Sequence, residues 1–291
     1  MKQNRERGQD GKEGAPDGSF LPKILPKSGA GKEVLPDLYA FLSRIVNVCF
    51  VGHPDAGDGW VMVDAGMPGS AGVLAREAER RFGAAGPRAI VLTHGHFDHV
   101  GAAAELARKW DVPVYAHPAE LPYLTGQSGY PKPDGSVEGG LIARLSPLFP
   151  HGPVDLGGRV LLLPEDGSVP HLPGWRWLHT PGHTPGHISL FRDGDRALIA
   201  GDAFVTVRQD SLCRVIMRRK EVCGPPRYLT TDWDAARDSA RKLEALRPAV
   251  AVAGHGLPMA GKELARGLTR LAKAFDRIAV PAYGRYVNRN P

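Results

Sequence analysis

Residues 89–99, with the sequence AIVLTHGHFDH, join a short apolar run directly to a cluster of polar side chains. The apolar run has the length and composition of a buried β-strand, and residues 102–110 (AAAELARKW) then have the pattern of an amphipathic helix. The polar side chains are therefore expected in the turn between a strand and a helix, where functional groups collect on α/β scaffolds. A soluble domain rarely needs so many neighbouring imidazoles for packing, so we interpret the turn as a candidate functional site. Its polar residues are His94, His96, Asp98 and His99.

The chain contains two successive halves in which strand-like runs combine with amphipathic helices. In the first half, strands are expected at residues 47–53, 59–66, 89–94 and 112–117, and helices at 70–83 and 102–110. In the second half, strands are expected at 159–164, 175–180, 187–192, 196–202 and 249–256, and helices at 231–248 and 261–275. Such a series predicts an α/β fold in which two sheets pack against each other with helices outside.

Two of the predicted helices carry sequence signals at their ends. Ser70 is expected to cap the helix at 70–83, and Gly83 is expected to end it. Thr231 is expected to cap the helix at 231–248, with Asp234 in the place of the glutamate of a capping box.

Residues 1–33 are polar and Gly-rich and are predicted to form a disordered tail, which leaves residues 34–291 as a single domain. Residues 118–158 are rich in Pro and Gly and form an excursion from the scaffold. Its apolar side chains have two alternative explanations: a satellite core under a long loop, or a lid over an apolar pocket. Phe97 and Phe204 are expected to add to the wall of such a pocket. The apolar residues of the excursion include Leu121, Tyr123, Leu124, Tyr130, Leu145, Leu148 and Phe149.

Composition and charge narrow the class of protein. No apolar run is long enough to span a bilayer, and the first residues lack the apolar core of a signal peptide, so a soluble cytoplasmic protein without a membrane partner is expected. The three cysteines (Cys49, Cys213 and Cys223) match no zinc ribbon or disulfide framework, which favours a reducing compartment. Part of the net charge of +6 lies in the predicted tail, so a nucleic-acid partner is not favoured. The basic run at 214–220 is expected to be a solvated face, with anionic-substrate binding as the alternative.

Three more residues of the same chemical types follow predicted strands further along the chain. His183 lies in the loop HTPGHTPGHIS between two strands, Asp202 ends the run ALIAGD, and His255 ends the run AVAVAGH. Imidazole and carboxylate groups suit Zn²⁺ and related first-row metals. With the first cluster they provide six ligands and one shared carboxylate, a count that favours two metal ions bridged by Asp202. Two adjacent cations would lower the pKa of a bridging water and supply hydroxide near neutral pH.

The order of these motifs resembles that of the metallo-β-lactamase superfamily, from about residue 45 to residue 260. The matching motifs are HGHFDH at 94–99, GHT around His183, Gly201-Asp202, Gly254-His255-Gly256, and VDAG with Asp64. The resemblance implies a four-layer αβ/βα sandwich of two mixed β-sheets flanked by helices, with a dinuclear metal site at its edge. It implies that Asp64 supports the site and that Asp98 also orients the nucleophilic water. It further implies one metal held by His94, His96 and His183, a second held by Asp98, His99 and His255, and Asp202 between them.

The activity that the resemblance implies is that of a metal-dependent hydrolase, with Asp98 and Asp202 as catalytic residues. A metal-bridging hydroxide would cleave an acyl bond of a small molecule (an ester, lactone, thioester or amide), and a lactone or ester is favoured. Zinc is the expected metal, with iron or manganese as alternatives. The other functions that fit are a phosphodiesterase or nuclease with the same dinuclear site, and a non-enzymatic metal-binding protein. A homodimer is compatible with the sequence.

The residues after Asp202 do not resolve the branch of the superfamily. Residues 203–208 depart from the Gly-Cys-Gly-like segment that thioester hydrolases of the glyoxalase II type usually carry. Val205 stands where many acyl-homoserine lactonases have a tyrosine, and Tyr228 or Tyr123 is a candidate substitute.

The remaining histidines lack motif partners. His187 shares the loop of His183, but the family pattern places the ligand at the first of its two Gly-His pairs. We therefore expect His187 to be a packed, hydrogen-bonded histidine. The histidines expected to be structural or exposed are His53, His117, His151 and His171.

Overall fold

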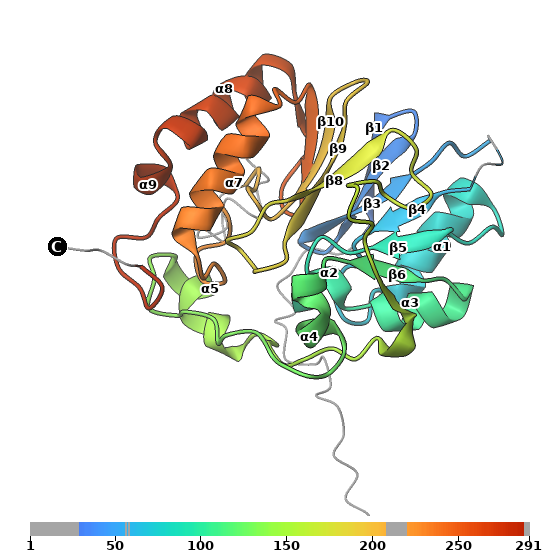
Figure 1. Cartoon of the computed structure of the whole chain (residues 1–291), viewed down its shortest axis with the longest axis horizontal. Coiled ribbons are helices and arrows are strands. Elements are labelled where there is room, and N and C mark those ends of the chain that lie inside the picture. Colours follow the sequence, from blue (N-terminus) through green and yellow to red (C-terminus); the bar gives the residue numbers. More distant parts are fainter. Residues whose placement is uncertain (1–28, 56, 58, 208–219, 288–291) are drawn as a thin grey trace, which may run out of the picture.

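The chain folds into four layers, with two β-sheets in the middle and helices on both outer faces (Figure 1). The structure is a computed structural model that describes residues 29–55, 57, 59–207 and 220–287. This is the αβ/βα sandwich of two mixed sheets that the sequence predicts. The helices on the first sheet are α1 (Ala71–Phe82) and α3 (Ala103–Trp110), and those on the second are α7 (Trp233–Ala245) and α8 (Gly261–Lys273).

The first sheet contains, in spatial order, β1 (Ala30–Leu35), β2 (Leu38–Ser43), β3 (Val46–Val51), β4 (Val61–Val63), β5 (Ala89–Val91), β6 (Val114–Ala116) and β7 (Val160–Leu162). Neighbouring strands from β1 to β4 pair antiparallel, and those from β4 to β7 pair parallel. Strands β3 and β4 are the two arms of the predicted hairpin, with Cys49 opposite Val63. The parallel half brings the carboxyl end of β5 to one edge of the sheet.

The second sheet contains, in spatial order, β12 (Met259–Ala260), β11 (Val250–Ala253), β10 (Ala197–Gly201), β9 (Ile188–Arg192) and β8 (Trp175–His179). Strands β10 and β11 are parallel, and the other neighbours pair antiparallel. Because β10 and β11 run in the same direction, the residues that follow them emerge at the same edge of this sheet.

Three apolar cores separate the four layers, and strand β2 shows how the alternation of side chains creates them. Leu38 and Ala40 pack in the core between the two sheets, whereas Tyr39 and Phe41 pack in the core beneath α1 and α3. On the other side of the molecule, residues of α7 and α8 pack against the outer face of the second sheet, with Phe191 among their contacts. Apolar side chains therefore fill the space between each pair of neighbouring layers.

Strand β1 corrects the boundary of the predicted tail. It begins at Ala30 and pairs with β2, so residues 30–33 belong to the sheet and not to the tail predicted over residues 1–33. Residues 1–28 lie outside the described part of the chain. The polar composition concealed the strand because β1 is an edge strand, where charged side chains are normal. One of them, Glu33, forms an ion pair with Arg81 of α1 at 2.6 Å.

Two helix starts differ from the predicted capping. The cap of α7 is Asp232, one residue after the predicted Thr231, because the Asp232 carboxylate accepts a 2.9 Å hydrogen bond from the Ala235 amide. Asp234 forms an ion pair with Arg237 instead of completing a capping box. Ser70 does precede α1, but its hydroxyl donates to the carbonyl of Met67 at 2.6 Å and makes no side-chain cap. The helix predicted at 261–275 ends at Lys273 and is followed by the short helix α9 (Phe275–Ile278).

Part of the excursion at 118–158 packs into the apolar core, and part of it lies next to the turn that carries His96 and Asp98. Its short helices are α4 (Leu121–Leu124) and α5 (Gly140–Leu145). Leu124 is fully buried in the first core, whereas Leu148 is exposed. Phe149 lies 5.8 Å, ring to ring, from both Phe97 and Tyr228. Phe204 faces the core under α7 and α8, so the expectation that it lines a pocket with Phe97 is wrong.

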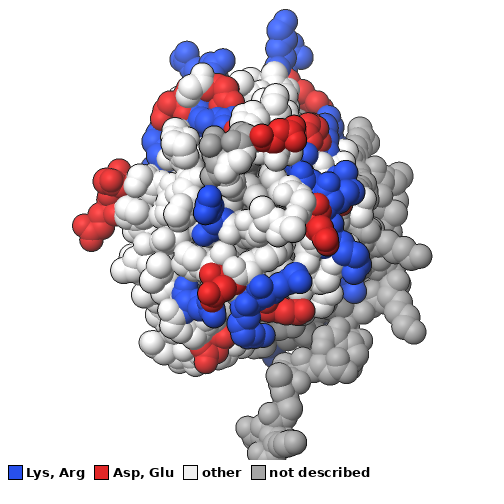
Figure 2. Space-filling model, turned by 90° about the vertical axis from the view of Figure 1, so that its right-hand side faces the viewer, with Lys and Arg blue, Asp and Glu red and all other residues white. Residues whose placement is uncertain are grey.

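The surface that carries α1 mixes positive and negative side chains, as Figure 2 shows for the face at the right of Figure 1. Ion pairs such as Arg80–Glu77 and Arg159–Asp111 contribute to this mixture. This face therefore lacks the single-signed basic field that nucleic-acid binding uses. Within the described residues, no helix combines the length and apolarity needed to cross a membrane. Apart from Lys220, the basic run at 214–220 lies outside those residues.

Candidate metal centre

The seven residues predicted as metal ligands all follow strands and converge at the polar edge between the two sheets. The turn after β5 carries His94 and His96, and the short helix α2 (Phe97–Val100) carries the next two candidates. His183 comes from the loop between β8 and β9. The residues that follow β10 and β11 complete the cluster. All seven side chains are at most 5% exposed: His94, His96, Asp98, His99, His183, Asp202 and His255.

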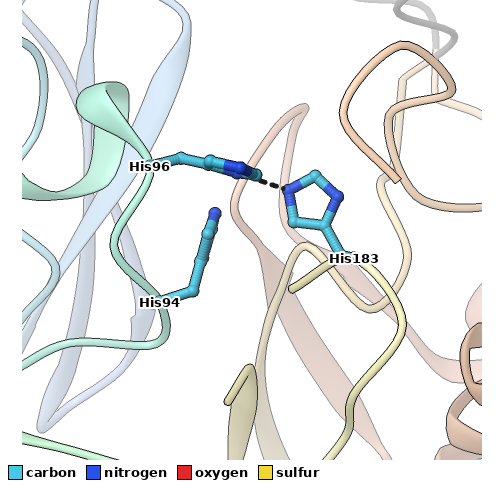
Figure 3. Close-up of side chains that lie close together, drawn as sticks. All are labelled: His94, His96 and His183. Atoms are coloured by element: carbon cyan, nitrogen blue, oxygen red, sulfur yellow. Dashed lines mark hydrogen bonds between the residues drawn. The ribbon is translucent and has the colours of Figure 1, made fainter. Parts of the chain in front are cut away.

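The first group of converging side chains consists of His94, His96 and His183 (Figure 3). Figure 3 shows two of these rings on the turn after β5 and the third on the opposite loop. Nδ1 of His96 lies 2.9 Å from Nε2 of His183, and the ring centres of His94 and His183 are 4.9 Å apart. One ligand atom from each residue fits within a 4.8 Å cluster. The three imidazoles thus surround a single point.

The second group consists of Asp98, His99 and His255, whose ligand atoms also lie within 4.8 Å of one another. Oδ2 of Asp98 lies 3.4 Å from Nε2 of His255. The carboxylate of Asp202 touches both groups, because its Oδ2 is 3.2 Å from Nε2 of His255 and 3.5 Å from Nε2 of His183. Asp202 therefore stands between the groups, as expected for a shared carboxylate.

These atoms fit divalent cations in spacing and in chemistry. Zinc bonds of about 2.0–2.1 Å to nitrogen place two tetrahedral ligand atoms about 3.3 Å apart, close to the 3.2–3.6 Å that separate Oδ2 of Asp202 from the Nε2 atoms of its three neighbouring histidines. Within the part of the chain that the structure describes, several buried polar atoms of the cluster have no hydrogen-bond partner, which is costly without a bound group. They are Nε2 of His94, Nε2 of His99, Oδ1 of Asp98 and Oδ1 of Asp202.

For His255 and His183, a hydrogen bond on the far side of the ring directs the other ring nitrogen toward the cluster. Nδ1 of His255 donates to the carbonyl of Ile45 at 2.8 Å. The hydroxyl of Thr230 donates to the carbonyl of Pro226, so it accepts from Nδ1 of His183 at 3.1 Å. Both rings therefore carry a proton on Nδ1 and point Nε2 toward the cluster, the orientation that metal-ligating histidines require.

Asp64 supports two further imidazoles, those of His99 and His94. Its Oδ2 accepts from Nδ1 of His99 at 2.7 Å, and its carboxylate also accepts from the amide and the hydroxyl of Thr93. Because the Thr93 hydroxyl donates to Asp64, it accepts from Nδ1 of His94 at 3.1 Å. Asp64 is held at a positive φ of 63°, a conformation that non-glycine residues adopt rarely. Its backbone is thus strained to place the carboxylate behind the cluster.

Burial and neighbouring charges shift the pKa values of the cluster residues in different directions. Burial lowers the pKa of His96 to about 4, and burial together with neighbouring imidazoles holds the pKa of His94 well below its usual value. Burial alone would also lower the pKa of His255, but the adjacent Asp202 and Asp98 outweigh it and raise that pKa to about 10. Burial opposes ionisation of Asp202, yet His255 and His99 hold the pKa of its carboxyl well below the usual range. The buried carboxylates therefore demand a positive charge beside them.

The other histidines and tyrosines that were considered from the sequence lie in different environments. His187 is packed and hydrogen-bonded as expected, with Nδ1 donating to the Thr180 carbonyl and Nε2 accepting from the Asp202 amide. Tyr228 is buried against Phe149. Tyr123 stacks on Tyr130 at a centroid distance of 3.9 Å. Of the four unassigned histidines, His117 is half-buried and stacks on His179.

Three residues beside the cluster were not predicted from the sequence, and a fourth, Tyr130, was expected only as part of a possible lid. Thr93 and Thr230 orient imidazoles, Glu120 bonds to both loops of the first group, and the ring of Tyr130 lies 4.5 Å from that of His96. The position of Thr93, just before His94 at a strand end, was the one available signal. The others come from segments that are distant in sequence and carry no recognisable motif.

Comparison with known proteins identifies the family. Residues 43–255 match the sequence pattern of the metallo-beta-lactamase superfamily. The chain is also 48% identical over 260 residues to a protein of Bacillus subtilis (strain 168) named "Probable metallo-hydrolase YflN", covering 89% of this chain and 98% of the relative. The chain therefore belongs to the metallo-β-lactamase superfamily, whose members are typically metal-dependent hydrolases.

Solved structures agree with this assignment. The protein TTHA1623, solved in a di-iron-bound form, is 29% identical, with a TM-score of 0.53 over 80% of this chain and 98% of that chain. A B3 metallo-beta-lactamase with an active-site glutamic acid is 19% identical, with a TM-score of 0.58 over 86% of this chain and 89% of that chain. At such an identity the second likeness supports the fold alone.

Proposed function

We propose that this chain is a metal-dependent hydrolase that holds two divalent cations and cleaves an acyl bond of a small molecule. The first group, His94, His96 and His183, would hold one cation, and the second group, Asp98, His99 and His255, would hold the other. The observation that carries the proposal is the position of Asp202, whose Oδ2 is within 3.6 Å of His183, His99 and His255 together. Such a carboxylate is placed to contact both cations.

The side chains of the cluster each have a task in this reaction. Bound divalent cations supply Lewis-acid chemistry, because they polarise a carbonyl and lower the pKa of water. Oδ1 of Asp98 is buried and has no hydrogen-bond partner among the residues that the structure describes, so it could accept a hydrogen bond from the attacking water and orient it. Thr93 and Thr230 fix the rings of His94 and His183, so these rings need no rearrangement during turnover.

A neutral ester or lactone is the substrate class that the surroundings favour. The side chains at the border of the cluster are aromatic: Tyr130 lies against His96, and Phe149 lies against Phe97. Pockets for small molecules are mostly apolar, with a few polar groups that fix orientation. Zinc is the metal that we propose, and iron is the alternative, supported by the di-iron form of TTHA1623.

The test is hydrolysis of a substrate panel by protein of measured metal content. The panel contains a lactone, an aryl ester, a thioester, a β-lactam and bis-p-nitrophenyl phosphate. We expect metal-dependent cleavage of the lactone or the ester that is abolished by His183→Ala and retained by His53→Ala, which changes an exposed histidine outside the cluster. Faster cleavage of the phosphodiester than of every acyl substrate would favour a phosphodiesterase. Absence of metal-dependent turnover across the panel would contradict the proposed acyl hydrolase.

A further inference from the structure

Glu120 is a fully buried carboxylate that accepts four hydrogen bonds. Its Oε1 accepts from the hydroxyl of Thr184 at 2.7 Å and from the amide of Gly186 at 2.8 Å. Its Oε2 accepts from the amide of Gly95 at 2.9 Å and from the hydroxyl of Tyr130. Burying a carboxylate is costly unless its oxygens are satisfied, and here the four donors are neutral groups. The cost is therefore offset by hydrogen bonds and not by an ion pair with one of these partners.

Three of the four donors belong to the two loops of the first group, and the fourth, Tyr130, belongs to the excursion. Gly95 lies between His94 and His96, and Thr184 directly follows His183. One of these loops follows β5 of the first sheet, and the other joins β8 to β9 of the second sheet. The single carboxylate of Glu120 thus connects two loops from different sheets at the point where their imidazoles meet.

The two glycines that Glu120 contacts are explained by this connection. Neither Gly95 nor Gly186 has a backbone φ in the left-handed region, so their conformations do not require glycine. A Cβ atom at Gly186 would lie 2.7 Å from Cγ of Glu120, and one at Gly95 would lie 2.7 Å from the hydroxyl oxygen of Tyr130. Both distances are shorter than real contacts allow. Side chains at these positions would therefore push the Glu120–Tyr130 pair away from the loops.

The second group has different supports. Asp64 holds His99, and the carbonyl of Ile45 holds His255. No hydrogen bond joins Glu120 to Asp98, His99 or His255, all of which lie in the described part of the chain. A change at Glu120 should therefore affect the two groups unequally.

We propose that Glu120 is the positioning residue that sets the separation of His94 and His96 from His183, and so determines the affinity of the first group for its cation. The inference rests on the proposed function, because it assigns a role within the same metal site. A carboxylate is needed because each of its oxygens accepts two donors, whereas the NH₂ of a glutamine is a donor only. Glu120→Gln would direct that NH₂ against two of the four existing donors. The loops would then separate without loss of the fold.

The experiment measures zinc affinity of the full chain, by competition with a chromophoric chelator, in two backgrounds. His255→Ala retains the complete first group, and His183→Ala retains the complete second group. Adding Glu120→Gln should weaken zinc binding about 10-fold in the first background, which is the typical effect of replacing a residue that orients a metal ligand. In the second background, zinc binding should weaken by less than about 3-fold. An equal loss in both backgrounds, or no loss in either, would overturn the inference.

The matched control is Asp134→Asn. Asp134 lies in the same excursion, is buried, and also accepts hydrogen bonds from a hydroxyl and backbone amides, those of Ser136 and Arg285, but it does not contact the metal loops. This variant should leave zinc affinity within about 2-fold in both backgrounds, because Asp134 makes no hydrogen bond to the loops that carry the metal ligands. A loss as large as that of Glu120→Gln would show a general effect of the excursion and overturn the inference.

A second measurement separates this inference from the proposed function. Hydrogen exchange of the Gly95 and Gly186 amides, followed by NMR, reports the connection itself and does not depend on metal binding. Glu120→Gln should accelerate exchange at both amides at least about 10-fold, because a lost bond of about 1.4 kcal/mol corresponds to that factor, and Asp134→Asn should not. Unchanged exchange would overturn the inference, whereas a chain that binds no zinc in either single-group background would overturn the proposed function.

Discussion

The amide of Asp202 donates a 2.8 Å hydrogen bond to Nε2 of His187, so a histidine outside the ligand groups holds the carboxylate at their centre. His187 and His183 belong to two successive Gly-His pairs of one loop. The first enters the cluster, and the second orients the residue that joins its two groups. Two similar local sequences therefore have different roles, and the groups that each histidine contacts in the folded chain distinguish them.

Replacement of these two histidines should separate the roles. His187→Gln should lower the free energy of unfolding by about 1–3 kcal/mol, because it disturbs buried hydrogen bonds, and should leave two metal equivalents at saturating zinc. His183→Gln should lose one equivalent. Denaturant unfolding and elemental analysis measure both quantities. A His187→Gln protein that loses a metal while keeping wild-type stability would reverse the assignment.

Single ligand losses should also distinguish the two groups. His94→Ala removes a donor of the first group and His255→Ala a donor of the second, so each variant should retain about one of two metal equivalents and lose most of the hydrolytic activity. Elemental analysis of the purified variants, with His53→Ala as the control, tests this. Full metal content in either variant would mean that the missing imidazole is not a ligand.

Asp98→Asn should act on turnover more than on folding. Asparagine keeps the shape but removes the charge and basicity of a carboxylate that faces the cluster, so kcat should fall roughly 10²–10⁴-fold. The melting temperature should change less than kcat, because among the described residues Oδ1 of Asp98 has no hydrogen-bond partner, and Oδ2 contacts His255 within the cluster itself. Steady-state kinetics at equal metal content provide the measurement, and a variant that keeps most of its kcat would contradict the role of Asp98.

The surface pair of His117 and His179 should contribute to acid sensitivity. Burial and the neighbouring His179 lower the pKa of His117 to about 4, and the rings stack at 4.2 Å. Because a histidine of the unfolded chain has a pKa near 6.5, the unfolded state takes up this proton first as the pH falls from about 6.5 to 4. His117 therefore opposes folding increasingly in that range.

Replacement of His117 should reduce this loss. His117→Asn keeps an acceptor for the Ala119 amide and removes the titrating ring, so the variant should lose less stability between pH 7 and pH 4.5 than the wild type. Denaturant unfolding at the two pH values measures the difference, with His53→Asn expected to follow the wild type. An equal or steeper loss in His117→Asn would contradict this explanation.

The sequence predicted the site residues because they lie just after strand ends or in the turns and loops next to them, and a strand end is visible as an apolar run followed by Gly, Asp or His. His94, Asp202 and His255 are examples, and the structure brings them together. Glu120 could not be recognised in the same way. It lies in a Pro-rich excursion, and one charged residue there is typical of a solvated loop. Its burial depends on donors that are 25 and 64–66 residues away.

Each prediction that proved wrong has a physical explanation. Strand β1 is polar because one side of an edge strand is free to face solvent, so its composition resembled that of the residues before it. Thr231 and Asp232 are both good caps, and the backbone geometry that selects Asp232 is not encoded by residue type alone. Phe204 follows Asp202 closely, but it packs in the core under α7 and α8 because of the tertiary path of the chain after β10.

Anomalous diffraction at the zinc edge, from crystals of the full chain grown with zinc, tests the central claim most directly. Two peaks are predicted, one among His94, His96 and His183 and the other among Asp98, His99 and His255, with the carboxylate of Asp202 in contact with both. A single peak, or two peaks of which one lies outside these groups, would contradict the dinuclear centre.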